Sequence, residues 1–371
     1  MDAGSYSYDD YRDQKAREQR DLARAGRDIA PIPKCVDPER RDATRMDLRA
    51  WCETYFARTF SRAWSPDHLM VIEAIQQAVL DGDLQTISMP RGTGKTSLCR
   101  CGLLWSVFHG HRRFGVLVGA TGSHSVDLMD TLKADMQTNE LLLEDFPHLV
   151  YPIHKLEQIT QRAKGQLCEG EPTLIQWNAE QVVLPRVANL PGAGSILRTV
   201  SLVGQIRGMQ HVTPEGETLR PDVFLADDPQ TDESARSVVQ TNQRLRTMRG
   251  SVMGLAGPGE RIAGLMTCTV IVRDDLADQL LDREKHPEWR GVRTKMLASL
   301  PTDVETHEEY AEVWRAEQRG DKEKGSALKF WKRRRRKLEA GAVASWPARF
   351  DAETEHSAIP HATNLRLRLG P

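Results

Sequence analysis

The chain has 371 residues, enough for roughly two to three domains or for one large α/β domain with appendages. Its 51 Lys and Arg residues nearly balance 52 Asp and Glu residues, which excludes a uniformly basic nucleic-acid coat and restricts any such contact to a local patch. Hydrophobic residues make up 39% of the chain, so wholesale disorder is excluded as well.

The first half of the chain predicts an arm followed by alternating helices and strands. Residues 1–48 are rich in Arg, Asp and Glu, and we expect a charged flexible arm there. Apolar spacing predicts a helix over 46–60, and Ser65-Pro66 begins a helix that runs to residue 80. The remaining patterns predict a strand over 84–89, a helix over 95–109, a buried strand over 114–120 and a helix over 125–139.

The second half continues this alternation. The patterns predict a hairpin over 173–184, a buried strand over 222–226, a helix over 234–253 and a buried strand over 262–272. Strands alternating with helices predict an α/β fold with a mostly parallel sheet covered by helices on both faces. We therefore expect one domain over 49–300, then a charged helical segment over 301–345 and a final segment over 346–371.

A glycine-rich stretch stands between a predicted strand and a predicted helix. Glycines let backbone N–H groups approach a phosphate, and a helix N-terminus adds partial positive charge. In such a loop Lys95 reaches the β- and γ-phosphates and the Thr96 hydroxyl binds Mg²⁺. Met89 replaces the first glycine of the usual pattern, so a glycine-rich turn before an ordinary helix is the alternative. The expected nucleotide-binding residues are Pro90, Arg91, Gly92, Thr93, Gly94, Lys95, Thr96 and Ser97.

Two carboxylates follow the predicted strand 222–226. Ligands bind open α/β sheets at the carboxyl ends of their strands. At that edge Asp227 can hold Mg²⁺ through water, and Asp228 can orient or deprotonate the attacking water. A strand-ending turn is the alternative explanation of Asp-Asp-Pro.

Three further residues are candidates for sensing the γ-phosphate or for stabilising the charge of the transferred phosphoryl group. Thr269, expected in the middle of the strand 262–272, can sense a γ-phosphate, although the pattern alone favours a β-branched core residue. Arg207, between Gly204 and Gly208, can stabilise the charge of a transferred phosphoryl group or contact DNA, unless it lies in an exposed turn. Arg91 is the rival for that charge-stabilising role.

The segment 329–337 holds seven basic residues in nine. Such a run suits contacts to a phosphate backbone, with binding that weakens as salt rises. A solvated helix face is the alternative. The candidate DNA-binding residues are Lys332, Arg333, Arg334, Arg335 and Arg336.

Over roughly residues 50–365 these motifs together resemble phage terminase large subunits. The glycine-rich loop is similar to their Walker A motif, which commonly lacks the first glycine, and Asp227-Asp228 resembles their Walker B motif and catalytic acid. The stretch from Thr269 is similar to their coupling segment, although its Gly, Trp and His are absent. The loop 204–208 and the stretch 345–350 resemble the family's Gly-x-x-Arg-Gly loop and Trp-Pro-x-Arg-Phe hinge.

The resemblance implies a P-loop NTPase of the additional-strand, RecA-like type. It would use ATP and Mg²⁺ to move double-stranded DNA into a procapsid, as a ring on the portal with a terminase small subunit. The family's nuclease follows the hinge, but only 21 residues follow Phe350, so we expect 346–371 to be a hinge with the truncated start of that region, without nuclease activity. The alternatives are another P-loop DNA translocase or helicase-type ATPase, and an inactive DNA-binding remnant of a prophage terminase.

The sequence also predicts where the protein is found. No stretch approaches the roughly 18 apolar residues of a membrane span, and the first residues lack a signal peptide. The six cysteines are scattered and form no Cys-x-x-Cys pair, so neither a disulfide framework nor a zinc module is indicated. We expect the reduced cytoplasm of a bacterial host, without secretion or membrane contact.

Overall fold

The computed structural model describes residues 12–17, 26–202, 204, 206, 208–257 and 259–369. Its centre is a sheet with the strand order β12-β1-β11-β10-β2-β7-β6-β5. The strands from β12 to β7 are parallel, while β6 and β5 are antiparallel additions at one edge. The predicted α/β class with a mostly parallel sheet is therefore confirmed, and the sheet is compatible with a RecA-like fold. The strands are β1 Leu84–Ser88, β2 Phe114–Gly119, β5 Gln176–Trp177, β6 Gln181–Val183, β7 Ile196–Ser201, β10 Val223–Asp227, β11 Ala263–Cys268 and β12 Trp289–Arg293.

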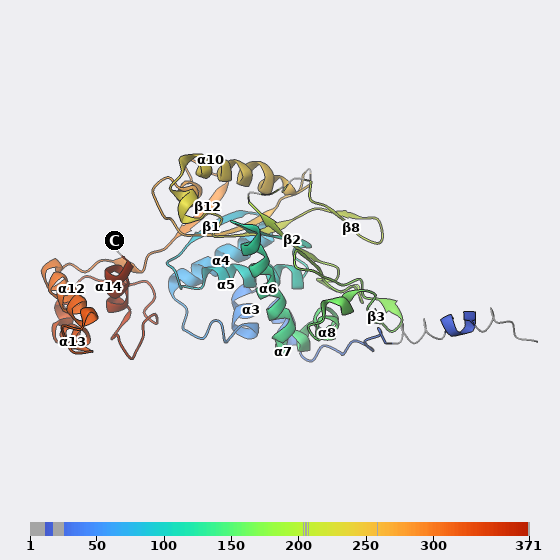
Figure 1. Cartoon of the computed structure of the whole chain (residues 1–371), viewed down its shortest axis with the longest axis horizontal. Helices are drawn as coiled ribbons and strands as arrows, with labels where there is room; N and C mark the ends of the chain where they lie inside the picture. The colour runs from blue at the N-terminus through green and yellow to red at the C-terminus, as the bar shows by residue number, and fades with distance from the viewer. Residues whose placement is uncertain are drawn as a thin grey trace, which may run out of the picture.

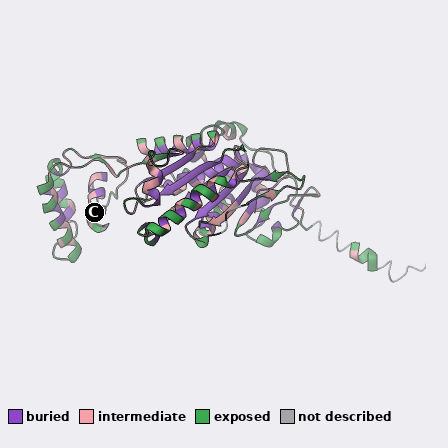
Figure 2. Cartoon of the chain, turned by 90° about the horizontal axis from the view of Figure 1, so that it is seen from above, coloured by how far each residue is buried: buried purple, intermediate pink, exposed green. Residues whose placement is uncertain are grey.

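Helices cover both faces of this sheet (Figure 1). Side chains alternate along β10, so Val223 and Leu225 join one buried cluster, while Phe224 and Ala226 join the cluster on the opposite face. Seen from above, the strands are buried between helices whose outer surfaces are exposed (Figure 2). The first cluster holds α3 Leu48–Tyr55, α4 Pro66–Asp81, α5 Lys95–Phe108, α6 Gly122–Thr138, α7 Glu140–Asp145 and α8 Pro147–His154, and the second holds α11 Leu276–Leu281 and packs against α10 Val238–Thr247.

Several element predictions are confirmed and others need correction. The helices over 66–80, 95–109 and 125–139 and the hairpin over 173–184 are present. The strand over 262–272 ends already at residue 268, and the helix over 234–253 divides into short pieces. The strands β7 and β12 were not predicted. The pieces are α9 Asp232–Ala235, α10, the π-helical turn η2 Met248–Val252 and the 3₁₀ turn η3 Met253–Leu255.

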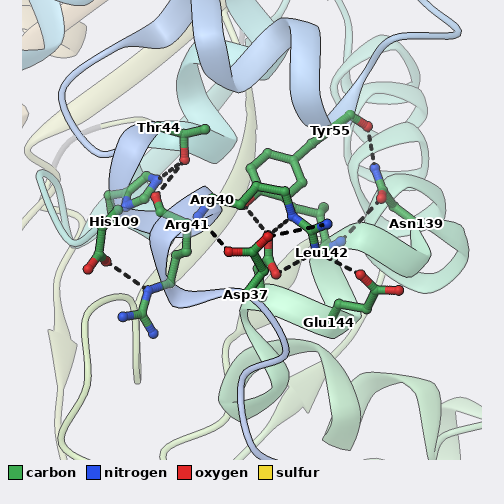
Figure 3. Close-up of polar contacts among 11 residues, drawn as sticks. Asp37, Arg40, Arg41, Thr44, Tyr55, His109, Asn139, Leu142 and Glu144 are labelled. Carbon is green, nitrogen blue, oxygen red and sulfur yellow. Dashed lines mark hydrogen bonds and ion pairs between the residues drawn. The ribbon is translucent and has the colours of Figure 1, made fainter.

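Part of the range 1–48, expected to be a flexible arm, is anchored to the sheet domain. Residues 38–43 form α2 (Pro38–Ala43), capped by Asp37. From α2, Arg40 Nη2 donates to Glu144 Oε2 at 2.7 Å (Figure 3). Arg40 Nε and Tyr55 Oη both donate to Asp145 Oδ2, each at 2.7 Å. Asp145 is fully buried, so these bonds compensate a charge that has left water. The rest of the arm lies partly outside the described residues.

The charged C-terminal segment folds as a small helical lobe. It consists of α12 (Val304–Arg319), α13 (Ser326–Leu338) and α14 (Ala358–Leu369), set apart from the sheet domain (Figure 1). Tyr310 packs edge-on against Trp331 with ring centroids 4.7 Å apart, and its hydroxyl donates to Asn364 Oδ1 at 2.6 Å. The lobe therefore takes its third helix from the range 346–371, which we expected to be only a hinge and a truncated segment.

The remaining elements are short. A 3₁₀ turn, η1, spans Thr160–Ala163. Among the described residues, no helix combines the length and apolar character that a bilayer span requires. The two-stranded sheets are β3 Leu167–Cys168 with β4 Glu171–Pro172, β8 His211–Val212 with β9 Thr218–Leu219, and β13 Leu297–Ser299 with β14 Val343–Ala344.

Candidate functional site

The glycine-rich loop connects β1 to α5 in a conformation that glycine permits. Gly92 and Gly94 have φ values of +75° and +87°, a region that other residues rarely adopt. Thr93 closes a turn by donating its hydroxyl to the Pro90 carbonyl at 2.7 Å. Among the described residues no side chain caps the start of α5, so its first N–H groups are available to an anion.

Lys95 brings the loop together with two other segments. Its Nζ lies 3.4 Å from Asp228 Oδ2 and donates to Thr269 Oγ1 at 3.2 Å. The side chain is largely buried, so the ammonium group depends on these partners in place of water. The predicted loop lysine, the second carboxylate and the predicted coupling threonine therefore meet at the carboxyl edge of the sheet.

Asp227, the last residue of β10, is held by three side chains. Thr96 Oγ1 donates to Asp227 Oδ1 at 2.7 Å, and Thr267 donates to the same oxygen. His124 Nε2 lies 3.3 Å from Asp227 Oδ2. Burial raises the pKa of Asp227, but the bonds from His124, Thr267 and Thr96 outweigh it and leave the pKa below its ordinary value. The carboxylate thus stays ionised, as a cation ligand must.

The hydroxyl of Thr96 and the carboxylate of Asp227 are hard oxygen donors of the kind Mg²⁺ prefers. Mg²⁺ usually takes one or two protein ligands and completes its octahedron with water and phosphate. Within the described residues, no group of three or more His, Cys, Asp or Glu side chains is placed to hold a metal. A pair of hard oxygen donors fits a Mg²⁺ whose remaining ligands are water and polyphosphate oxygens.

Asp228 differs from its neighbour in both backbone and charge. Its φ is +35°, and its N–H donates to the Thr267 carbonyl at 3.1 Å, which turns the chain sharply at the end of β10. Burial, followed by the proximity of Asp227, raises the pKa of Asp228, although Lys95 opposes this. A carboxylate with a raised pKa is a better proton acceptor.

The structure places the other predicted residues in different ways. Thr269 does not lie in the middle of a buried strand, as we expected, but one residue beyond the end of β11, because the strand stops at Cys268. Arg91 has an exposed side chain. Arg207 lies outside the described residues.

A cavity of about 220 Å³ adjoins the loop. One wall is formed by Gly92, Thr93, Gly94 and Ser97 from the loop and the start of α5. The other wall is formed by Phe60, Arg62, Trp64, His68 and Trp346, together with neighbouring residues. The rings of Phe60 and Trp64 lie 5.0 Å apart, so the wall offers aromatic surface beside the phosphate loop.

Sequence reasoning missed several polar residues of this edge. Thr267 stands opposite Asp227 in the register of β10 and β11, two residues before the predicted Thr269. His124 comes from the first turn of α6, far away in the sequence. Gln230 Nε2 donates to the Thr269 carbonyl at 3.0 Å and to Asp275 Oδ2 at 2.9 Å, which ties the segment after β10 to the segment after β11. Only the strand register and tertiary packing reveal these contacts.

The predicted DNA-binding residues lie on α13 and fall into two groups. Arg334 lies 3.9 Å from Glu309 and over the Phe330 ring, while Arg335 pairs with Glu339 at 2.9 Å. Over the part of the chain that the structure describes, no ion pair involves the remaining three, which are exposed: Lys332, Arg333 and Arg336.

Comparison with known proteins adds no family assignment. No protein-family model matches the chain, and no curated protein matches its sequence.

Proposed function

We propose that the carboxyl edge of the sheet binds ATP with Mg²⁺ and hydrolyses it. The observation that carries this proposal is the convergence of Lys95, Asp228 and Thr269 beside the bonded pair Thr96–Asp227. This arrangement supplies a phosphate-binding cation, a donor pair for Mg²⁺ and a proton acceptor at one edge of the sheet.

In this proposal each residue has a defined task. The amides of the loop and Lys95 bind the phosphates, and Thr96 with Asp227 would hold Mg²⁺, which neutralises phosphate charge. Asp228 accepts a proton from the water whose oxygen bonds to the γ-phosphorus while the bond to the ADP oxygen breaks. Arg91 and Arg207 remain the candidates for stabilising the charge of the transferred group. The cavity beside the loop offers the aromatic rings of Phe60 and Trp64, on which the base of a nucleotide can stack.

The strand order supports the additional-strand type of P-loop ATPase within this proposal. The strand β11 lies between β1, which leads into the loop, and β10, which ends in the two carboxylates. Together with the resemblance of the motifs, this order leads us to propose the motor part of a DNA-packaging terminase. The exposed cations of α13 are the proposed contact to double-stranded DNA.

The test is ATP turnover by the purified chain with and without duplex DNA. We expect Mg²⁺-dependent hydrolysis that Lys95→Ala reduces at least about 100-fold, because the lysine binds the phosphates directly. Lys155→Ala, which changes a lysine on the surface near α8, is the matched control and should retain wild-type turnover. Unchanged turnover in Lys95→Ala would show that the loop is not the phosphate site.

A further inference from the structure

The chain returns to the phosphate loop after the helical hairpin α12–α13. Trp346 Nε1 donates to the Ala63 carbonyl at 2.7 Å, and its ring lies edge-on to His68 with centroids 4.5 Å apart. Arg62 Nη1 donates to the Ala348 carbonyl at 2.8 Å. The segment 345–349 is therefore docked beside the loop by the Ala63 carbonyl and by the side chains of Arg62 and His68.

Arg349 reaches the phosphate loop itself. Its Nη2 donates to the carbonyl of Arg91, and a Cβ placed on Gly92 would lie 3.2 Å from the same nitrogen. His68 holds a second loop carbonyl, that of Thr93, with its Nε2 at 3.0 Å. The Ser65 N–H donates to His68 Nδ1, which assigns the ring proton to Nε2.

These two bonds determine which way the loop amides point. In a planar trans peptide the carbonyl and the N–H point in opposite directions. Holding the Arg91 carbonyl therefore directs the N–H of Gly92 away from Arg349, and holding the Thr93 carbonyl directs the N–H of Gly94 away from His68. The N–H of Thr93, between them, donates to the Pro90 carbonyl at 3.3 Å, so the N–H groups of Gly92 and Gly94 are the ones that this arrangement offers to an anion.

The environment of Arg349 also favours an anion nearby. Its Nη1 is buried and has no hydrogen-bond partner among the described residues. Burial, reinforced by the neighbouring Arg62, lowers the pKa of the Arg349 guanidinium. Negative charge in the loop relieves both effects, so phosphate binding and the docking of Arg349 stabilise one another.

We propose that Arg349 is a positioning residue of the phosphate loop and that Trp346–Arg349 forms a latch which links phosphate binding to the C-terminal helical lobe. The link is short, because β14, which follows α13, ends at Ala344 and α14 begins at Ala358. By thermodynamic reciprocity, a latch that strengthens nucleotide binding must itself be strengthened by nucleotide. This inference rests on the proposed function, because it requires phosphate in the loop.

The test measures MgADP affinity by calorimetry on the full chain. We expect Arg349→Ala to weaken binding by roughly 10- to 100-fold, the range for losing a hydrogen bond from a charged group. Arg349→Lys should recover part of that loss, because it restores a cationic donor. Arg319→Ala, which removes an exposed arginine of α12, is the matched control and should bind like the wild type.

Amide hydrogen exchange distinguishes an Arg349 that links nucleotide binding to the latch from an Arg349 that only stabilises the fold. MgADP should slow amide exchange over 343–350 in the wild type but not in Arg349→Ala. If Lys95→Ala loses MgADP binding while Arg349→Ala binds within twofold of the wild type, the latch is wrong and the nucleotide site stands. If Lys95→Ala binds as well as the wild type, the nucleotide site is wrong and the latch falls with it.

Discussion

The carboxyl edge of the sheet and the exposed face of α13 both concentrate charge, but they hold it in opposite ways. At the edge, Asp227 accepts hydrogen bonds from Thr96 and Thr267 and lies beside His124. On α13, the exposed residues Lys332, Arg333 and Arg336 form no ion pair within the described residues. The first region fixes its charges before any ligand arrives, whereas the second leaves them mobile in solvent.

This difference predicts how each region responds to substitution. Charges held by neighbours in a partly desolvated site interact strongly, and one substitution there removes a large share of the interaction. Exposed cations attract a polyanion collectively, and salt weakens each contribution. Single changes at buried charges should therefore have large effects, while changes on α13 should be small and graded.

The ion pair between Arg40, which is partly exposed, and the fully buried Asp145 gives the largest expected effect on stability. Arg40→Ala leaves the carboxylate of Asp145, which is fully buried, without its cation, so we expect a loss of about 3 kcal/mol in the free energy of unfolding. Chemical denaturation measures this loss. Arg41→Ala removes an ion pair to the exposed Asp42 and should cost less than about 1 kcal/mol. If both variants lose the same free energy of unfolding, the burial of Asp145 does not make its ion pair more important than an exposed one.

The buried His109 should make the free energy of unfolding depend on pH. Burial lowers its pKa from 6.5 to about 3, so the folded state holds it neutral, while the unfolded state takes up a proton below pH 6.5. The stability that comes from keeping His109 neutral is therefore fully present above pH 6.5 and is lost as the pH falls toward 3. Between pH 6 and 4, wild-type stability should fall more steeply than that of His109→Gln, by up to about 1.4 kcal/mol per pH unit. Parallel pH profiles would contradict this account.

The smallest expected effect on stability comes from α13. Replacing Lys332, Arg333 and Arg336 with Gln should change the free energy of unfolding by less than about 0.5 kcal/mol per residue. In a DNA-binding titration, the slope of log affinity against log salt should become shallower by up to about 3. The paired residues Arg334 and Arg335, replaced together, are the control and should reduce the slope less. If the slope of log affinity against log salt is unchanged in the triple variant, this face of α13 does not contact DNA and is only solvated surface.

The sequence predicted those parts of the molecule that depend on local pattern. The helix that begins after Ser65 has a capping residue and a proline in its first turn, and the buried strands 114–120 and 222–226 are continuous apolar runs. The strands β7 and β12 escaped prediction because charged residues interrupt them: Arg198 in the first, and Arg290 and Arg293 in the second. Their pairing in the sheet depends on distant neighbours.

The same distinction holds at the candidate site. Lys95, Thr96, Asp227 and Asp228 lie in short motifs, and the structure brings all four together. Arg349 and His68 act on the loop through its carbonyl oxygens, a contact that no spacing in the sequence encodes. Backbone contacts of this kind become visible only when the fold places the two segments side by side.

The most direct test of the central claim is to compare ATP binding with ATP hydrolysis in Asp228→Asn. The substitution keeps the shape of the side chain and suits the φ of +35°, but it removes the proton acceptor. We predict ATP affinity within about threefold of the wild type and a hydrolysis rate at least about 100-fold lower. Hydrolysis at the wild-type rate would contradict the assignment of this edge as an ATP-hydrolysing site that uses Asp228.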